Sequence, residues 1–472
     1  MRWQRTEAAH RVPRTHHGNA TGAGRDRGGG SLASRRVTEL PRDPAVQAAL
    51  TTLGCADATA LRIGGLAATE LAKRFGTPLY AFDAAVLRAR TAAVQQAIGP
   101  HVQLLWSVKA NPSLAVTACL RAAGVGAEIA SLGELHVALA AGHQAAALRF
   151  AGPGKTDHEI ATALQHGIGC FHVESASELA SIARLAAAAG QRARIALRVN
   201  LPQELGGARM RMGGRSTRFG IDAGQVPELL RIAHAQPALQ LDGLHVYAGT
   251  QVFDANAFVQ HARALCELAV AWERDLGLHL PAIDLGGGFG VAAYAGDGSF
   301  DLAAAGAGLQ ALVAQYGGAS RQWFVELGRF LAAPAGVFLA RVVRTKTSGG
   351  ERHAVLDGGL HQHAAAAGVG TVVRRPPLLV HATALDAQQG EPVTLGGPLC
   401  TPADQFAEQI PFAPLAEGDL VAVLHSGAYG LTYSPTAFLS HPAPAEVMVD
   451  GDVARIVRMR PAAEDALRAQ LP

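Results

Sequence analysis

The middle of the chain alternates between two spacings of hydrophobic residues. Short apolar runs rich in β-branched residues are typical of buried strands, and the stretches between them repeat apolar residues at helical spacing. The predicted strands span residues 102–108, 126–131, 147–152, 170–175, 194–200, 239–249, 282–288 and 323–329. Helical stretches such as 113–124, 132–142, 157–167 and 176–190 separate them and end in glycine, a common residue after a helix.

This alternation predicts parallel strands joined by right-handed crossovers. Eight such units in about 230 residues have the size of a (β/α)8 TIM-like barrel. An open doubly wound sheet is the alternative that periodicity alone leaves. In a barrel the active site lies at the C-terminal ends of the strands. That rule selects Lys109, Glu128, Arg198, Tyr247, Gly286, Gly287, Gly288 and Glu326.

The rhythm changes after residue 335, where strand-like runs follow one another with turns and almost no helix between them. These runs predict a C-terminal all-β domain, a sandwich or a barrel, beside the α/β barrel. Residues 79–82 form a short apolar run that could add a strand to that sheet. The expected organisation is a disordered basic tail at 1–45, an N-terminal segment at 46–82 that contributes to the β domain, the barrel at 83–334 and the β domain at 335–472.

Composition and charge narrow the possible functions. The 472 residues are 49% hydrophobic and 17% charged, which excludes a mostly disordered chain, a collagen-like chain and a disulfide scaffold. The net charge of +3 is uneven, because residues 1–36 carry +6 and the rest therefore −3. A basic tail could contact nucleic acid or a membrane surface, but such tails are usually inert and the folded part is no polyanion binder. We expect no nucleic-acid or membrane partner.

The cysteines and the hydrophobic runs predict a compartment. Five scattered cysteines with no CxxC pair favour reduced thiols in the cytoplasm over a disulfide framework. No run approaches the ~20 apolar residues of a membrane span. We therefore expect a cytoplasmic protein.

Lys109 ends the first predicted strand, in WSVKAN, beside Trp106 and Val108. Partial desolvation at that position is expected to lower its pKa, which would suit a lysine that forms a Schiff base. An ordinary surface lysine at a strand end is the alternative. The chain has only four lysines for chemistry that needs a primary amine: Lys73, Lys109, Lys155 and Lys346.

Four further motifs carry candidate chemistry. The glycines at 286–288 in DLGGGFG let backbone N–H groups approach a phosphate, although tight βα turns also favour glycine. Glu326 and Arg329 in ELGR end the eighth strand, where a structural salt bridge is the alternative. Cys400 in GPLC is either a buried thiol or a proton donor, and Tyr429 in GAYG either reaches a ligand phosphate or packs. The sequence lacks HExxH, a paired Cys–His cluster and GxSxG, so we expect no metal site and no serine nucleophile.

Taken together the motifs are more specific than any one of them. WSVKAN, GAEIASLGEL, LRVN, GLHVYAGTQ, DLGGGFG, ELGR, GPLC and GAYG occur in one order over roughly residues 70–450. In the identity and order of these motifs the chain resembles the fold-type III decarboxylases that depend on pyridoxal 5'-phosphate. This is the group of diaminopimelate and ornithine decarboxylases. The resemblance implies that cofactor, a carboxy-lyase activity on an amino acid, and a homodimer with shared active sites.

The resemblance also implies a role for each matching residue. Lys109 matches the lysine that holds the cofactor as a Schiff base, and Glu326 matches the acid that pairs with its pyridine nitrogen. Cys400 matches the residue that reprotonates Cα after CO2 departs, and would reach the cofactor of the partner subunit. Further matches surround the cofactor: Gly286, Gly287, Gly288, Gly328, Arg329 and Tyr429 at the phosphate, with Glu128 and Arg198 around the lysine and the ring.

One departure from the family pattern concerns the cofactor ring. The family's HxGS motif supplies a histidine that stacks on the ring, whereas this chain has Tyr247, Ala248, Gly249 and Thr250 there. Tyr247 can still stack as an aromatic residue, and His245 lies on the same face of the strand. Either residue could meet the ring, with Thr250 nearby.

Other departures concern the substrate. The ornithine and diaminopimelate enzymes follow their cysteine with a carboxylate that binds the distal ammonium of the substrate, whereas Thr401 stands here and Asp404 is the next acid. A distal ammonium therefore loses its partner, and selectivity built on such a partner can be large. Arg375 resembles the diaminopimelate enzymes' arginine for the substrate carboxylate, but Leu379 replaces the expected tyrosine. The predicted substrate contacts are Arg329, Arg375, Thr401, Asp404 and Tyr429.

Several segments are similar to a specialised branch of the family. CTPADQF, GPGKT, FHVES, GGRSTRFGI and SPTAFLSHP resemble decarboxylases of siderophore assembly, of aminoacyl groups on carrier proteins, and of exopolysaccharide-associated clusters. We therefore expect α-decarboxylation of an L-amino acid whose side chain is extended, acylated or carrier-linked. Decarboxylation of free diaminopimelate is the main alternative. A racemase lacks support from ELGR and GPLC, and a non-catalytic regulator would be expected to have lost the cofactor residues.

Overall fold

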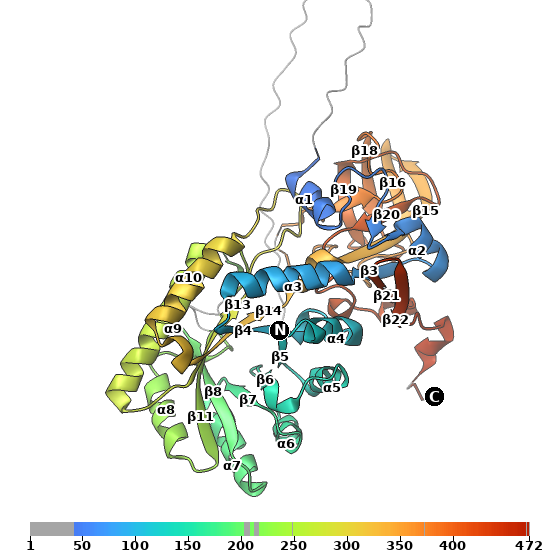
Figure 1. Ribbon diagram of the computed structural model, residues 1–472. Helices are drawn as coiled ribbons and strands as arrows, with labels where there is room; N and C mark the ends of the chain where they lie inside the picture. The colour runs from blue at the N-terminus through green and yellow to red at the C-terminus, as the bar shows by residue number, and fades with distance from the viewer. Residues whose placement is uncertain are drawn as a thin grey trace, which may run out of the picture. The chain divides into compact units, whose positions relative to one another are not determined.

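Eight parallel strands close into a barrel in the computed structural model of the chain (Figure 1). In order around the barrel they are β4 (Val102–Ser107), β5 (Gly126–Ile129), β6 (Leu148–Phe150), β7 (Cys170–Val173), β8 (Ala193–Asn200), β11 (Leu239–His245), β13 (Ala282–Gly287) and β14 (Gln322–Leu327). The pairs β7–β8 and β14–β4 complete the ring. The predicted TIM-like barrel is therefore confirmed, and the open sheet is excluded.

The structure describes residues 42–202, 208–211, 217–247, 249–371, 373–468 and 470–471, with the backbone alone for 208–211. Most of the predicted basic tail lies outside the described residues. Its last predicted positions overlap helix α1 (Pro44–Thr52), whose first turn is capped by the Asp43 carboxylate accepting the N–H of Ala45.

Helices cover the outside of the barrel (Figure 1). They are α3 (Ala84–Ile98), α4 (Leu114–Ala122), α5 (Leu132–Ala140), α6 (Asp157–Gln165), α7 (Ala176–Ala188), α8 (Val226–Ala235), α9 (Ala255–Leu276) and α10 (Leu302–Gln315). Ser131, Thr156 and Ser175 fix the starts of α5, α6 and α7, because each side chain accepts a backbone N–H three residues later. Within the described parts of the chain, no helix has the length and apolar character that spanning a membrane requires.

The C-terminal part is a β-rich domain, as predicted. Its strands are β15 (Gly336–Ser348), β16 (Glu351–Leu356), β17 (Leu379–His381), β18 (Pro392–Gly396), β19 (Gln405–Pro411), β20 (Leu420–Val423), β21 (Ala445–Asp450) and β22 (Val453–Arg458). The main sheet has the order β19-β18-β16-β15-β3-β21-β22, and β20 pairs with both β15 and β17.

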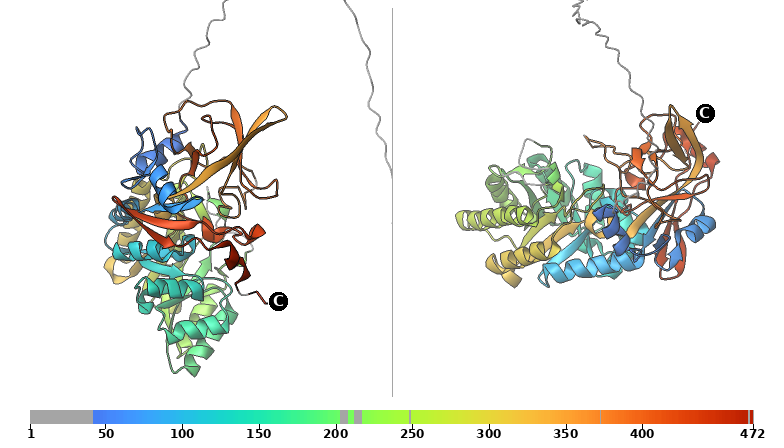
Figure 2. Two further views of the ribbon diagram at one scale, coloured as in Figure 1. Left: turned by 90° about the vertical axis from the view of Figure 1, so that its right-hand side faces the viewer. Right: turned by 90° about the horizontal axis from the view of Figure 1, so that it is seen from above.

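The N-terminal segment supplies a strand to this sheet. After β1 (Arg62–Ile63), β2 (Leu66–Ala67) and α2 (Ala68–Phe75), strand β3 (Leu79–Asp83) pairs antiparallel with β15 and parallel with β21. Figures 1 and 2 show the blue N-terminal elements beside the orange and red C-terminal strands. All five residues of β3 are buried, because strands cover it on both edges and the sheet is packed on both faces.

One strand of the β domain was not among the predicted runs. β19 has an irregular burial pattern, its pairing with β18 shifts register twice, and Gln409 has a positive φ of 46°. A bulged strand breaks the two-residue alternation on which prediction from sequence depends. Three short strands complete the fold: β9 (Ala208–Arg211), which pairs with β12 (Gly249–Val252), and β10 (Ile221–Asp222) beside β8.

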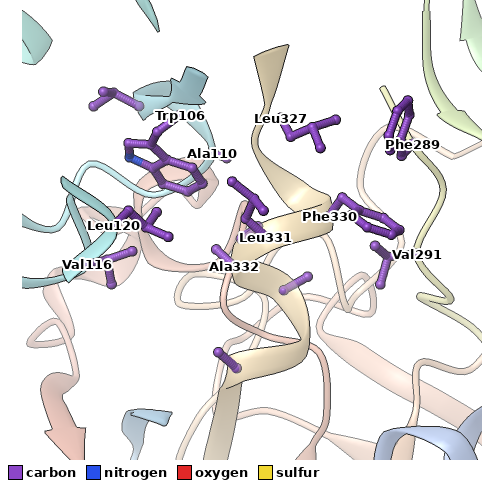
Figure 3. Close-up of a cluster of buried hydrophobic side chains, with 14 of the residues drawn as sticks. Trp106, Ala110, Val116, Leu120, Phe289, Val291, Leu327, Phe330, Leu331 and Ala332 are labelled. Atoms are coloured by element: carbon purple, nitrogen blue, oxygen red, sulfur yellow. The ribbon is translucent and has the colours of Figure 1, made fainter. Parts of the chain in front are cut away.

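A short helix, α11 (Arg329–Ala332), carries the chain from the last barrel strand into the β domain. Figure 3 shows it between two groups of buried side chains, with Trp106 and Leu120 on one side and Phe289 and Val291 on the other. The rings of Phe330 and Phe289 meet edge to face at 5.5 Å between centroids. This packing fixes Glu326, just before α11, and Arg329, its first residue, which line the site described below.

The core around α11 predicts a stability effect. Leu331 is fully buried there, so Leu331→Ala should lower the free energy of unfolding by about 2–5 kcal/mol through lost burial and an unfilled cavity. Equilibrium denaturation measures the change. The matched control is Leu467→Ala, because Leu467 is 69% exposed and its truncation should change stability by no more than about 0.5 kcal/mol. Equal effects of the two substitutions would contradict this account of the core.

Candidate active site

A cavity of about 720 Å³ lies at the C-terminal ends of the barrel strands, against loops of the β domain. From the barrel it is lined by Lys109, Glu128, Arg198, His245, Tyr247, Thr250, Glu326 and Arg329. From the β domain it is lined by residues that include Arg375 and Tyr429. Ten of the residues selected from the sequence thus meet in one cavity.

Lys109 follows β4 in a single 3-10 turn, and its Nζ donates to both carboxylate oxygens of Glu128, at 2.8 and 2.7 Å. Burial acts to lower the pKa of Lys109, but the negative charges of Glu128 and Glu326 outweigh it and raise that pKa above its ordinary value. The expected depressed pKa is therefore wrong for the protein without a bound ligand. The sequence could not show that Glu128 stands directly opposite the amine.

Glu326 lies near the end of β14, buried among two histidines. Its Oε2 is 3.3 Å from Nε2 of His245, and its Oε1 is 3.6 Å from Nδ1 of His172. Burial, and then the charge of Glu128, raise the pKa of Glu326 to about 8. In the described structure no cation lies within 4.0 Å of this carboxylate unless one of the imidazoles is protonated. The structural salt bridge to Arg329 that the sequence left open does not form.

Arg198 is held by an acid that the sequence analysis did not select. Its Nη1 donates to Oε1 of Glu174 at 2.8 Å, and both side chains are nearly inaccessible to solvent. Glu174 also accepts the backbone N–H groups of Gly152 and Gly220, at 2.8 and 3.1 Å. The FHVES motif contains Glu174, so its place at the C-terminal end of the predicted strand 170–175 was the available signal.

Tyr247 and His245 take different places. The Tyr247 ring faces the cavity, with Nζ of Lys109 5.6 Å from its centroid. His245 lies deeper, 1% exposed, beside Glu326 and stacked on His172 at 4.1 Å between ring centroids. Burial raises the pKa of Tyr247 to about 12, so its phenol is neutral at physiological pH. This placement favours Tyr247 as the residue that meets a ring bound beside Lys109.

Arg329 and Tyr429 form the side of the cavity nearest the β domain. The guanidinium carbon of Arg329 lies 4.4 Å from the Tyr429 ring centroid, and Nε of Arg329 is buried without a hydrogen-bond partner. The Tyr429 N–H donates to the carbonyl of Ala110 at 2.7 Å, which ties this loop to the lysine turn. Gly328 is required for close packing here, since a Cβ would lie 2.7 Å from that of Ala110.

The three glycines of DLGGGFG allow neighbouring backbones to approach closely. A Cβ at Gly286, Gly287 or Gly288 would lie 2.1, 1.8 or 2.1 Å from a carbonyl oxygen of an adjacent segment. Gly286 and Gly288 also have positive φ values of 64° and 91°. The strand packing accounts for these glycines by itself, and their contact with a phosphate remains a prediction.

Three residues predicted near the substrate lie away from the described cavity lining. Cys400 is exposed, and Thr401 Oγ1 accepts the N–H of Ala403 at 3.3 Å. Asp404 is 4% exposed, and its two oxygens accept the N–H groups of Leu360 and Leu399 at 2.6 and 2.8 Å. Asp404 thus holds its own loop together, and we correct its predicted role in substrate binding.

Arg375 lines the cavity, but with a partner of its own. It forms an ion pair with Asp297, and its guanidinium carbon lies 5.0 Å from the ring centroid of Tyr294. The sequence did not indicate Tyr294, Gln251, His363 or His425, which also line the cavity. Tyr294, His363 and His425 lie outside the helices and strands, where no periodicity marks them, whereas Gln251 ends the GLHVYAGTQ motif and was overlooked.

The residues present fit pyridoxal 5'-phosphate by their chemistry. Lys109 supplies the primary amine that an aldehyde requires, and Arg329 supplies a guanidinium without a carboxylate partner in the described cavity. Glu326 supplies a buried acid with an oxygen that has no hydrogen-bond partner. An amine, an anion-binding group and an acid for a ring nitrogen are the three groups that this cofactor needs.

Comparison with known proteins agrees with this fit. The pyridoxal binding domain of the pyridoxal-dependent decarboxylases matches residues 84–333. An L-glutamyl-[BtrI acyl-carrier protein] decarboxylase of Niallia circulans is 34% identical over 85% of this chain and 96% of its own. A diaminopimelate decarboxylase of Zymomonas mobilis is 33% identical over 84% of this chain and 94% of its own. The crystal structure of diaminopimelate decarboxylase from Helicobacter pylori with L-lysine superposes with a TM-score of 0.78, at 26% identity over 85% and 98% of the two chains.

The pairing of Lys109 with Glu128 predicts a pH effect. Because the Glu128 charge opposes burial, Glu128→Gln should lower the pKa of Lys109 and leave more free amine at any given pH. The pH midpoint for trapping pyridoxal phosphate on Lys109 with borohydride, followed by mass spectrometry, should therefore move to lower pH. Glu228→Gln is the control, because that carboxylate is 66% exposed on α8 and remote from the lysine. An unchanged midpoint in Glu128→Gln would contradict the assignment.

Proposed function

This chain belongs to the pyridoxal-dependent decarboxylases, and from that premise we propose that it removes the α-carboxyl group of an L-amino acid whose side chain is extended, acylated or linked to a carrier protein. The similarity to an enzyme named for an L-glutamyl group on an acyl-carrier protein supports this substrate class. Loss of an α-carboxyl group requires that carboxyl to be free. The carrier would therefore be joined through the side chain.

The observation that carries the proposal is the charge of the cavity lining. Its described acids are Glu128, which binds Lys109 through both oxygens, and Glu326, which lies buried beside His245. Neither carboxylate is available to a distal ammonium of a substrate. Exposed apolar residues at the rim, Val369 and Val373, suit a neutral extension of the side chain better than a charged one.

Each residue has a task in the proposed reaction. When bound, the cofactor would supply an electron sink for the electron pair left when CO2 departs. Lys109 would hold the cofactor and exchange its proton with Glu128, which is within hydrogen-bonding distance. Glu326 would hold the ring nitrogen, and Arg329 would bind an anionic group of the cofactor or the substrate. Tyr247 and Tyr429 exclude water from the ring with their apolar faces.

The proton for Cα comes from Cys400 in this proposal. Cys400 is exposed and is not part of the cavity lining described for its own chain, so a second copy of the chain would bring it to the site. The catalytic unit is then a homodimer with shared active sites. The cytoplasm suits this arrangement, because a thiol that donates a proton must stay reduced.

Decarboxylation of diaminopimelate is a second candidate. The similarity to the Zymomonas mobilis enzyme favours it, as does Arg375 at the cavity wall. The two candidates differ in the charge at the far end of the substrate. Diaminopimelate carries an ammonium and a carboxylate there, and the described lining has Arg375 for the carboxylate but no free acid for the ammonium.

The substrate class is tested by measuring CO2 release from purified enzyme loaded with the cofactor. An L-glutamyl group joined through its side chain to pantetheine or to an acyl-carrier protein should be turned over at least about 100-fold faster, in kcat/KM, than meso-diaminopimelate. Lys109→Ala should abolish turnover of both. Faster turnover of diaminopimelate would reject the proposed class and favour the second candidate. Release of CO2 from neither would reject both.

The shared site is tested by mixing two inactive variants. Lys109→Ala and Cys400→Ala should each lose nearly all activity alone. A mixed dimer has one site with both residues intact, so an equal mixture should recover about a quarter of the parent activity. Subunit exchange is checked by giving the two variants different affinity tags and co-purifying them. Glu417→Ala, at an exposed position, mixed with Lys109→Ala should show half of the parent activity with or without exchange. No recovery from the first mixture, although exchange occurs, would contradict the shared site.

A further inference from the structure

A group of four ionisable side chains lies buried in the barrel beneath the cavity. The imidazole of His172 lies between two acids. Its Nδ1 is 3.6 Å from Oε1 of Glu326, and its Nε2 is 3.8 Å from Oδ2 of Asp284. His245 lies against Oε2 of Glu326 at 3.3 Å. All four side chains are at most 2% exposed. Five of their polar atoms have no hydrogen-bond partner, which is costly for buried groups.

One placement of the hydrogen atoms gives most of these five polar atoms a hydrogen-bond partner. A neutral imidazole has one N–H and one acceptor nitrogen. If Nδ1 of His172 carries the hydrogen, it donates to Glu326, and Nε2 then needs a donor. Asp284 provides one only when its Oδ2 is protonated. Its Oδ1 meanwhile accepts the N–H of Gly286 at 3.1 Å, and His245 donates from Nε2.

The environment of each group favours this arrangement. Burial lowers the pKa of His172 well below its ordinary value, as do the nearby charges of His245, Arg149, Lys155 and Arg198. Burial also raises the pKa of Asp284 well above its ordinary value. These shifts favour a neutral His172 and a protonated Asp284. In this arrangement the one proton of the two acids resides on Asp284, and each oxygen of Glu326 lies toward an imidazole N–H.

A metal ion is the competing explanation for two histidines and two acids whose ligand atoms lie within 4.8 Å of one another. The rings of His172 and His245 are stacked at 4.1 Å with 21° between their planes. The lone pairs of an imidazole lie in the plane of its ring, so those of two stacked, nearly parallel rings lie in separate planes, whereas a bound ion needs ligands that converge on one point. The geometry therefore favours hydrogen bonds among the four side chains over a metal centre.

We propose that His172 and Asp284 are positioning residues, which act through Glu326 by presenting an N–H to one of its oxygens and so hold its carboxylate in place for the ring nitrogen of the cofactor. The two distances, 3.6 and 3.8 Å, would need to shorten to hydrogen-bonding range on binding of the cofactor, as active-site hydrogen bonds commonly do. This inference does not depend on which amino acid is decarboxylated.

The test compares two ligands that differ only at the ring nitrogen. Dissociation constants are measured for pyridoxal phosphate and for its analogue with carbon in place of that nitrogen. His172→Phe keeps the stacked ring but removes the N–H, whereas His172→Asn places an amide N–H near the position of Nδ1. Asp284→Asn keeps a donor toward His172, and Asp284→Leu removes it. His261→Phe is the matched control, a buried histidine on α9 outside the cavity lining.

His172→Phe and Asp284→Leu should weaken binding of pyridoxal phosphate by about tenfold or more, and binding of the carbon analogue by no more than about twofold. His172→Asn and Asp284→Asn should retain most of the parent's preference for the nitrogen-containing ring. Equal losses for both ligands would show a merely structural role and overturn the proposal, as would no loss for either.

Two further results separate this proposal from its competitors. In a Glu326→Gln background, His172→Phe should cause no additional loss, because the histidine acts through that acid. A stoichiometric metal in the purified enzyme that is lost in His172→Phe would overturn the proposal in favour of a metal centre. Because these measurements need no turnover, they stand even if the proposed substrate is wrong.

Discussion

The pairing of β14 with β4, and of β4 with β5, is the constraint on which the site depends. Leu327 pairs with Trp106 and Ser107 pairs with Glu128, so the three strand ends reach the cavity side by side. Lys109 follows β4 at once and lies between the acids at the ends of β5 and β14. The amine and the two carboxylates are thus brought together by backbone hydrogen bonds. Their mutual attraction alone would not do this, because the desolvation cost of burying charged groups can exceed the Coulomb energy gained when they pair.

Most charges inside the barrel are neutralised locally. Arg198 is paired with Glu174, and Lys155 with Glu178 at 2.7 Å. Two groups in the described lining differ. Glu326 has only imidazoles near its oxygens, and Arg329 has an aromatic ring where an acid would be expected. An acid without a cation and a cation without an acid, in one cavity, complement a ligand that carries one charge of each sign.

Strand-forming patterns in the sequence predicted the barrel well, because buried parallel strands and glycine-terminated helices leave local signals. Gly124, Gly142, Gly167 and Gly190 follow their helices with positive φ, as the patterns indicated. The bulged strand β19 left no such signal.

The site was predictable only in part, for a related reason. Residues at strand ends could be selected from the sequence, but their partners could not. Glu174 and His172 hold the selected residues from other strands, and Asp404 turned out to bind its own loop. Which acid faces which base follows from the register between strands that lie far apart in the sequence. No local pattern records that register.

Tyr247 gives the departure from the family motif a physical meaning. A histidine in that place would offer an imidazole that can gain or lose a proton, whereas the phenol of Tyr247, with its pKa raised to about 12, stays neutral at physiological pH. Tyr247 thus keeps an aromatic surface at this wall of the cavity without adding a charge there. The groups that can still share protons near Lys109 are Glu128 beside it and the buried set around Glu326.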